Sequence, residues 1–288
     1  FFMTNGTSQG LFIVVAIIIF GIFIAISYLL FRNTLKPSLS TIFTDSLEQA
    51  EGNLTRKTPS PQYPKITEEQ KYVKIRSENN GAGETEIWVE ISQLEDGTLS
   101  IDKSSNYNGD YLYGNSKMTG TLVFPDKIHD IPVTKIKNNA FQSTNLNGKI
   151  QFPKFLTEIG SSSFEKSAPT SVVFNDGLKV IGDSIFSKAY SSFEINLPDS
   201  VEHIGNNAFS TVMMLRGELK LPENLKTIGR GAFANSNYSG ELIIPKNVES
   251  IESLAFPITK FSKVTIKNPN TKIANNSIKM QDGTWFSR

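Results

Sequence analysis

The residue types most often used in catalysis and metal binding are scarce in this chain. It has no cysteine and only two histidines, His129 and His203. His129 belongs to a loop, and His203 lies between Val201 and Ile204 at a position that we expect to face solvent. Neither has the cluster of partners that a metal centre or a general base requires. We therefore expect a protein without enzymatic activity, with no catalytic residue, no metal ligand and no cofactor.

Side chains suited to recognition occur in the stretches that vary most between otherwise similar segments. Met213 and Met214 lie within Ser210–Arg216, and Tyr238 lies within Asn235–Ser239. Flexible thioethers and amphipathic aromatic rings are common contact groups at interfaces. These three residues are candidate ligand contacts, and local packing over the adjacent segment is the alternative.

A six-residue pattern recurs every 22 to 24 residues through the last two-thirds of the chain. Each copy begins with isoleucine and ends with phenylalanine, usually with alanine before the phenylalanine. A fixed period of this length predicts a solenoid, in which each unit buries its apolar side against its neighbours. The predicted repeat core consists of Ile136, Phe141, Ile159, Phe164, Ile181, Phe186, Ile204, Phe209, Ile228, Phe233, Ile251 and Phe256.

One repeat illustrates the expected role of each position. Glu218–Leu221 alternates like a strand, and Pro222 ends that strand because proline cannot donate to a ladder. Gly229 is expected to allow a tight turn, Ala232 a close approach between neighbouring coils, and Phe233 to fill the space between them. Equivalent strand faces are predicted at Leu122/Phe124, Ile150/Phe152, Val172/Phe174, Ile195/Leu197 and Leu242/Ile244, with a degenerate last unit at Val264–Ile273.

Residues of about 120–270 resemble the BspA-type leucine-rich repeat, because six roles recur in the same order in six units. The resemblance implies a right-handed, curved solenoid with short stacked parallel strands and no catalysis. It also implies a surface protein that adheres to other molecules. The expected partner is an unknown protein or glycan bound along an extended face. The net charge of +1 gives no reason to expect nucleic acid.

The segment before the repeats is expected to be a small β-meander. Alternating residues from Tyr72 onward indicate strands, and Asp96–Gly97 is a hairpin turn signal. We assign 66–119 as a cap of the solenoid, 120–288 as the solenoid itself, and the proline-rich residues 53–65 as a semi-rigid spacer.

The N-terminal residues are strongly apolar. Leu11–Phe31 contains 21 residues without a charge, long enough to span a bilayer core as a helix. An amphipathic continuation follows, so residues 1–52 are predicted to form one long helix. The fold class is thus a mainly β leucine-rich-repeat solenoid head with one long N-terminal helix. Arg32 and Lys36 follow the apolar run, which would place the head in the cytoplasm unless a basic leader once preceded Phe1.

Residues 1–52 also resemble the N-terminal helix of type IV pilins and pilin-like proteins. The resemblance rests on the N-terminal Phe1, the uncharged run and its amphipathic continuation; Asn5 departs from the glutamate usual at the fifth position. It implies that Phe1 is a processed N-terminus and that the helix leaves the membrane to pack against copies of itself in a filament core. The alternative is a monomeric, single-pass anchored adhesin or receptor. The expected location is a surface filament, or the plasma membrane with an extracellular head.

Overall fold

The structure is a computed structural model that describes residues 20, 22, 24, 63–77, 85–105, 118–189, 194–210, 212 and 216–287. The chain divides into two units, Phe1–Ser60 and Pro61–Arg288. In the first unit only Phe20, Ile22 and Ile24 are described; each has helical backbone and an exposed side chain. The predicted helix over 1–52 and most of the spacer over 53–65 thus lie outside the described residues. Among the residues described, no helix has the length and apolar character needed to cross a bilayer.

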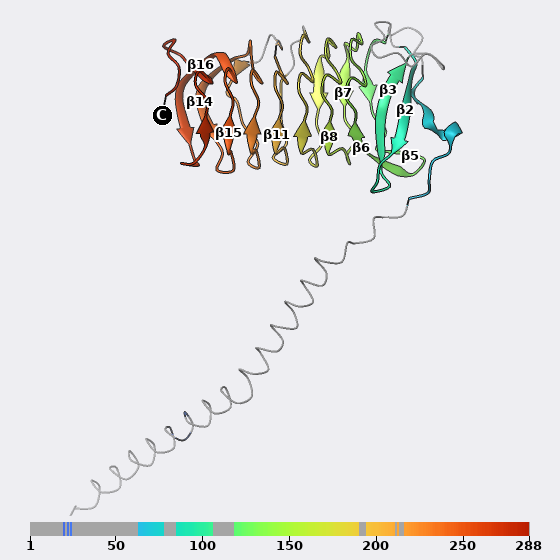
Figure 1. The fold of residues 1–288 in the computed structure, drawn as a ribbon, viewed down its shortest axis with the longest axis horizontal. Helices are drawn as coiled ribbons and strands as arrows, with labels where there is room; N and C mark the ends of the chain where they lie inside the picture. Colours follow the sequence, from blue (N-terminus) through green and yellow to red (C-terminus); the bar gives the residue numbers. More distant parts are fainter. Residues whose placement is uncertain are drawn as a thin grey trace, which may run out of the picture. The chain divides into compact units, whose positions relative to one another are not determined.

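The second unit is a solenoid built on one long sheet (Figure 1). A short 3-10 helix, η2 (Glu68–Lys71), leads into three antiparallel strands, β1 (Tyr72–Arg76), β2 (Ile87–Gln93) and β3 (Leu99–Ser105). Gly97, with φ of 84°, lies in the turn between β2 and β3, as the Asp96–Gly97 signal predicts. β3 then pairs in parallel with β6 (Ile131–Ile136), so the antiparallel strands continue directly into the solenoid sheet.

Each later coil adds one very short parallel strand to this long sheet, and each of these strands ends at the repeat isoleucine. These strands are β8 (Glu158–Ile159), β10 (Val180–Ile181), β11 (His203–Ile204), β13 (Thr227–Ile228), β15 (Ser250–Ile251) and β17 (Lys272–Ile273). We call the coils 1 to 7 after Ile136, Ile159, Ile181, Ile204, Ile228, Ile251 and Ile273. β5 (Lys127–Ile128) pairs with β6 alone.

Two smaller sheets form on another side of the coils. β4 (Leu122–Val123), β7 (Lys149–Gln151) and β9 (Ser171–Val173) make the first. β12 (Arg216–Gly217), β14 (Asn237–Ile244), β16 (Phe256–Ile266) and β18 (Ile278–Met280) make the second. The strand predicted at Glu218–Leu221 is absent, as is one at Ile195/Leu197, although Leu219 and Leu221 are buried. In these two segments the apolar alternation identified the inward side chains, but the backbone does not pair as a β-strand.

The core is a stack of phenylalanine rings. Phe141, Phe164, Phe186, Phe209, Phe233 and Phe256 are fully buried, and successive rings stack with centroids 5.1 to 6.3 Å apart. A second column, Phe124, Phe152 and Phe174, stacks beside it at 5.9 and 5.5 Å. Each ring therefore covers its neighbours above and below, which explains why no single coil can form a core by itself.

The repeat glycine has a different role from the one expected. A Cβ built at Gly229 would lie 2.6 Å from the backbone nitrogen of Asn206 in the preceding coil, and Gly205 and Gly182 are equally close to their preceding coils. The glycine therefore permits close stacking of coils and is not the turn residue. The turn falls two residues later, where Asn139, Ser162, Asn207 and the equivalent residues of the other coils have φ between 53° and 64°.

Candidate binding surface

The long sheet carries an ordered set of outward side chains on the solenoid. Each repeat isoleucine points into the core, so the residue just before it points outward. Stacking aligns these residues in one outer column, at the spacing of neighbouring strands, about 4.8 Å. The outer column consists of Lys135, Glu158, Val180, His203, Thr227, Ser250 and Lys272.

A second column, one residue earlier, forms a ladder of alternating charges. Glu202 accepts from Lys226 Nζ at 2.6 Å and lies 3.6 Å from Lys179 Nζ. Glu249 continues the alternation in the next coil, where its backbone N–H donates to Lys226 O. The hydrogen bond from Lys226, together with the two lysine charges, holds the pKa of Glu202 below its ordinary value. The same hydrogen bond raises the pKa of Lys226. This charge ladder is therefore largely neutralised by its own pairs.

A third column, two residues after the isoleucine, joins coils through side chains. Asn138 Oδ1 accepts the backbone N–H of Ser161 at 2.8 Å, and Ser161 Oγ accepts that of Asp183 at 3.1 Å. Asp183 Oδ1 accepts the N–H of Asn206 at 2.7 Å, and Asn206 Oδ1 that of Arg230 at 2.8 Å. We call this series the acceptor ladder. Each step satisfies a backbone donor that the sheet leaves unpaired, which is worth about 1 kcal/mol.

A shallow groove of about 250 Å³ lies between the outer column and the acceptor ladder. Its walls include Glu158, His203 and Thr227 on one side and Asn138, Ser161 and Asp183 on the other, and glycines line the space between them. We call this feature the axial groove because it crosses successive coils. Its polar walls and open form suit an extended ligand better than a compact one.

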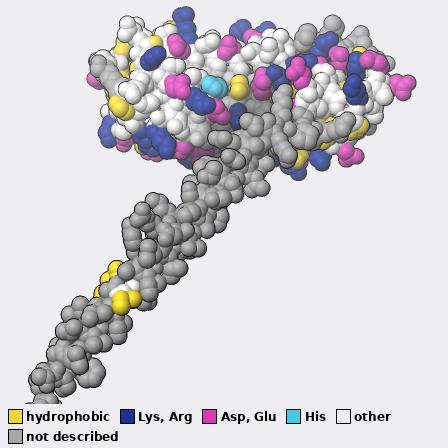
Figure 2. Space-filling view, turned by 60° about the horizontal axis from the view of Figure 1, so that its bottom comes forward, with side chains coloured by type: hydrophobic (Ala, Val, Ile, Leu, Met, Phe, Trp, Pro, Cys, Tyr) yellow, Lys and Arg dark blue, Asp and Glu magenta, His cyan; other side chains and the backbone are white. Residues whose placement is uncertain are grey.

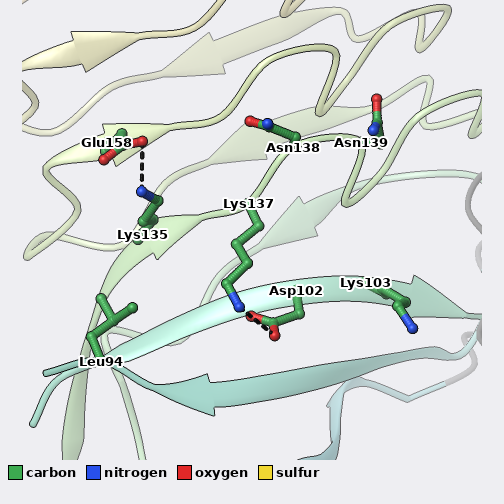
Figure 3. Close-up of a pocket in the computed structure, with 8 residues that line it drawn as sticks. All are labelled: Leu94, Asp102, Lys103, Lys135, Lys137, Asn138, Asn139 and Glu158. Atoms are coloured by element: carbon green, nitrogen blue, oxygen red, sulfur yellow. Dashed lines mark hydrogen bonds and ion pairs between the residues drawn. The ribbon is translucent and has the colours of Figure 1, made fainter.

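The axial groove opens into a larger depression of about 500 Å³ at the junction with β3 (Figure 3). Lys137 Nζ reaches down to Asp102 Oδ2 at 2.7 Å and also donates to Ser92 Oγ at 2.9 Å. Lys135 pairs with Glu158 at 2.8 Å across the mouth. Asn138 and Glu158 line both spaces, so the groove and the depression form one surface.

Charges of both signs are interspersed over the visible face of the head (Figure 2). Ion pairs between neighbouring coils, such as Lys188–Glu165 at 3.1 Å and Lys263–Glu241 at 2.9 Å, account for part of this mixture. Such a surface favours complementary, residue-by-residue contact over long-range attraction of one charge sign.

The two histidines lie apart. His203 is half-buried in the outer column with Nδ1 2.9 Å from Thr227 Oγ1, and no carboxylate among the described residues contacts its other nitrogen. His129 is exposed, with Nε2 3.2 Å from Gln70 O. Within the described residues, no group of three or more acidic or histidine side chains is arranged to hold a metal ion.

Of the three predicted recognition residues, only Tyr238 belongs to the described part of the chain. Met213 and Met214 lie outside the described residues. Tyr238 is 4% exposed and packs edge-on against Phe233, and burial raises the pKa of its hydroxyl. It is a core residue of β14 and not an exposed contact, because alternation along the strand turns it inward.

The twelve predicted repeat-core residues all lie in the core with at most 1% exposure. The acceptor ladder was not predicted, although the sequence contains a pattern that indicates it. The second residue after the isoleucine is Asn, Ser, Asp and Asn in coils 1 to 4, and all three residue types have side chains that can accept a hydrogen bond.

Parallel coils of this period, stacked on phenylalanine rings and carrying exposed polar columns on a sheet, define a leucine-rich-repeat solenoid. The model of the BspA-type leucine-rich repeat region, with six copies, matches residues 109–216 and 157–282. The chain belongs to this family.

Several solved structures are similar to the chain. A leucine-rich repeat protein from T. pallidum, TpLRR, is 21% identical over 65% of this chain and 83% of its own, with a TM-score of 0.48. One from Bacteroides ovatus is 16% identical over 77% and 70%, with a TM-score of 0.35. A leucine-rich cell surface protein from Faecalibacterium prausnitzii is 15% identical over 69% and 76%, with a TM-score of 0.32. No curated protein matches the chain significantly in sequence.

Proposed function

We propose that this chain is a cell-surface binding protein whose head recognises a protein or glycan through the axial groove and its adjoining depression. One observation carries the proposal: the exposed polar columns are continuous over successive coils and enclose a groove that no described part of the chain fills. A repeat solenoid offers this kind of extended face for adhesion, and membership of the BspA-type family supports the same role. The role is one of binding and not of catalysis.

Blocking the groove tests this function. Val180 lies in the outer column and lines the groove, so Val180→Arg adds a large charged side chain where a ligand would lie. Gln151→Arg places the same side chain on β7, in another sheet, and serves as the control. We expect the purified full chain to bind at least one member of a panel of immobilised extracellular proteins and glycans. Val180→Arg should weaken that binding at least tenfold, about 1.4 kcal/mol, and Gln151→Arg should not. Equal binding by both variants would refute the proposal.

We further propose that residues 1–52 assemble with copies of themselves into a filament that displays the heads, after insertion in the membrane. The uncharged run Leu11–Phe31 and its amphipathic continuation support this proposal. The same run also supports a monomeric, single-pass anchor, which is the second candidate. Electron microscopy of sheared surface material with an antibody against the head separates the two. Labelled filaments are expected, and recovery of the chain only in detergent-extracted membranes would reject the filament.

A further inference from the structure

The acceptor ladder changes at coil 5, where arginine replaces the acceptor. Arg230 stands two residues after Ile228, the position held by Asn138, Ser161, Asp183 and Asn206 in coils 1 to 4. A guanidinium only donates hydrogen bonds. The side chain of Arg230 therefore cannot accept a hydrogen bond from the backbone N–H of Ser253, the equivalent residue of coil 6.

Two unpaired donors consequently lie in one column. Within the described part of the chain, neither the guanidinium of Arg230 nor the backbone N–H of Ser253 has a hydrogen-bond partner. The register of β13 and β15 sets the two residues in adjacent coils, and the N–H of Gly231 donates to Ser253 O at 3.3 Å. A guanidinium and a backbone donor at equivalent positions of adjacent coils can together form a small site for an oxyanion.

We propose that Arg230 and the N–H of Ser253 bind the carboxylate of an acidic side chain of a protein partner. An oxygen of that carboxylate takes the place that Asn206 Oδ1 takes one coil earlier, and the guanidinium pairs with the group in two-point fashion. The inference rests on the proposed function, because it names the chemistry that one end of the binding face selects.

The surroundings favour a carboxylate over a phosphate. Glu252 is exposed and directly precedes Ser253 in the chain. Its charge repels a dianion about twice as strongly as a monoanion. A planar carboxylate also matches the guanidinium fork.

The same face favours a protein over an acidic glycan. No aromatic side chain lines the described walls of the axial groove, so a sugar ring has no flat apolar surface there to pack against.

Replacement of Arg230 by asparagine should raise the thermal stability of the head and weaken its binding of an acidic peptide. Arg230→Asn restores an acceptor for the N–H of Ser253, so we expect a melting temperature about 2 to 4 °C higher. The same change removes the guanidinium. Binding of a fluorescein-labelled oligoglutamate peptide to the full chain at physiological salt should therefore fall about tenfold, as measured by fluorescence anisotropy.

Three further measurements make the test specific. Lys246→Gln removes an exposed charge that has no ion-pair partner among the described residues and lies outside this column, and it should leave peptide affinity unchanged. Glu252→Gln should tighten binding, because it removes the repelling charge. Oligoglutamine should not bind.

The outcomes separate this proposal from the groove function. Equal loss in Arg230→Asn and Lys246→Gln would overturn the carboxylate site, while a loss of partner binding in Val180→Arg would still support the groove. Tighter binding of oligogalacturonate than of oligoglutamate, abolished in Arg230→Asn, would overturn the assignment to a protein partner.

Discussion

At Ser163 a polar residue stands at a core position where most coils have alanine. Its hydroxyl is buried without a hydrogen-bond partner among the described residues, whereas coils 1, 4, 5 and 6 have alanine at the same position. Ser167, four residues later, is equally buried but donates to Phe164 O at 2.7 Å. Two buried serines in one coil thus differ only in whether the hydroxyl is satisfied.

This pair gives a matched prediction. Ser163→Ala should increase the free energy of unfolding by about 1 kcal/mol, because it removes an unsatisfied buried group. Ser167→Ala should decrease it by about the same amount, because it removes a hydrogen bond. Thermal unfolding of the two variants checks the signs; stabilisation by both, or destabilisation by both, would contradict this account.

At the residue scale, the sequence predicted burial correctly at the positions where the volume of the side chain determines it. The Ile and Phe positions are buried because no other part of the coil can fill the space between stacked backbones. For Tyr238 the packing alternative holds, because the ring faces Phe233. The turn expected at Gly229 is wrong, because this glycine is required by the nearby backbone of Asn206. Contacts between coils do not appear in the sequence of a single repeat.

At the scale of the element, the charge ladder ties three successive short strands together. β10, β11 and β13 have only two residues each, so their backbone ladders are short. The pairs of Glu202 with Lys226 and Lys179 add cross-strand attraction to every step. Because the three side chains are partly exposed, each pair adds only a modest amount.

The pKa shifts define a pH window for this contribution. The pKa of Glu202 is lowered on folding, so its contribution is complete above the ordinary value of 4.5 and is lost as pH falls through the folded value. The pKa of Lys226 is raised, so its contribution is complete below 10.5 and is lost as pH rises through the folded value.

Glu202→Gln should therefore differ most from the unaltered chain near neutral pH and least in acid. Urea unfolding at several pH values measures the difference, and it should shrink in high salt. Glu69→Gln, on η2 and far along the chain from this ladder, is the control and should show little dependence. A constant difference down to strongly acid pH would argue against the ion pairs.

The sequence identified only part of the element organisation. Strands β1 to β3 and the Asp96–Gly97 turn follow from alternation and turn chemistry. The solenoid part of the long sheet lies elsewhere than expected, in strands that end at the repeat isoleucines and that have only two residues each from β8 to β17. Two residues are too few to produce a periodic pattern, so this sheet and the groove beside it could not be found by periodicity.

At the scale of the whole head, we expect the cooperativity of unfolding between coils to depend on contacts in the phenylalanine stack. Phe209 lies near its middle, 6.3 Å from Phe186 and 5.5 Å from Phe233. In a linear array each coil contacts only its neighbours, so a fault in the middle weakens the connection between the two halves.

Phe209→Ala should lower the free energy of unfolding by about 3 to 5 kcal/mol and split the unfolding into two steps. Phe286→Ala, near the C-terminal end and only partly buried, should weaken the head less and keep one transition. Hydrogen exchange during urea unfolding distinguishes the coils on each side of the fault. A single transition in Phe209→Ala would mean that other columns carry the coupling.

Every column takes one residue from each coil, so the head can change in length only by whole coils. Insertion or deletion of a whole period of 22 to 24 residues leaves rings, glycines and acceptors aligned with their counterparts. Any other change in length shifts all columns at once. Gene variation can therefore lengthen or shorten this face in whole coils of about 4.8 Å each. An inserted coil brings its own set of exposed residues.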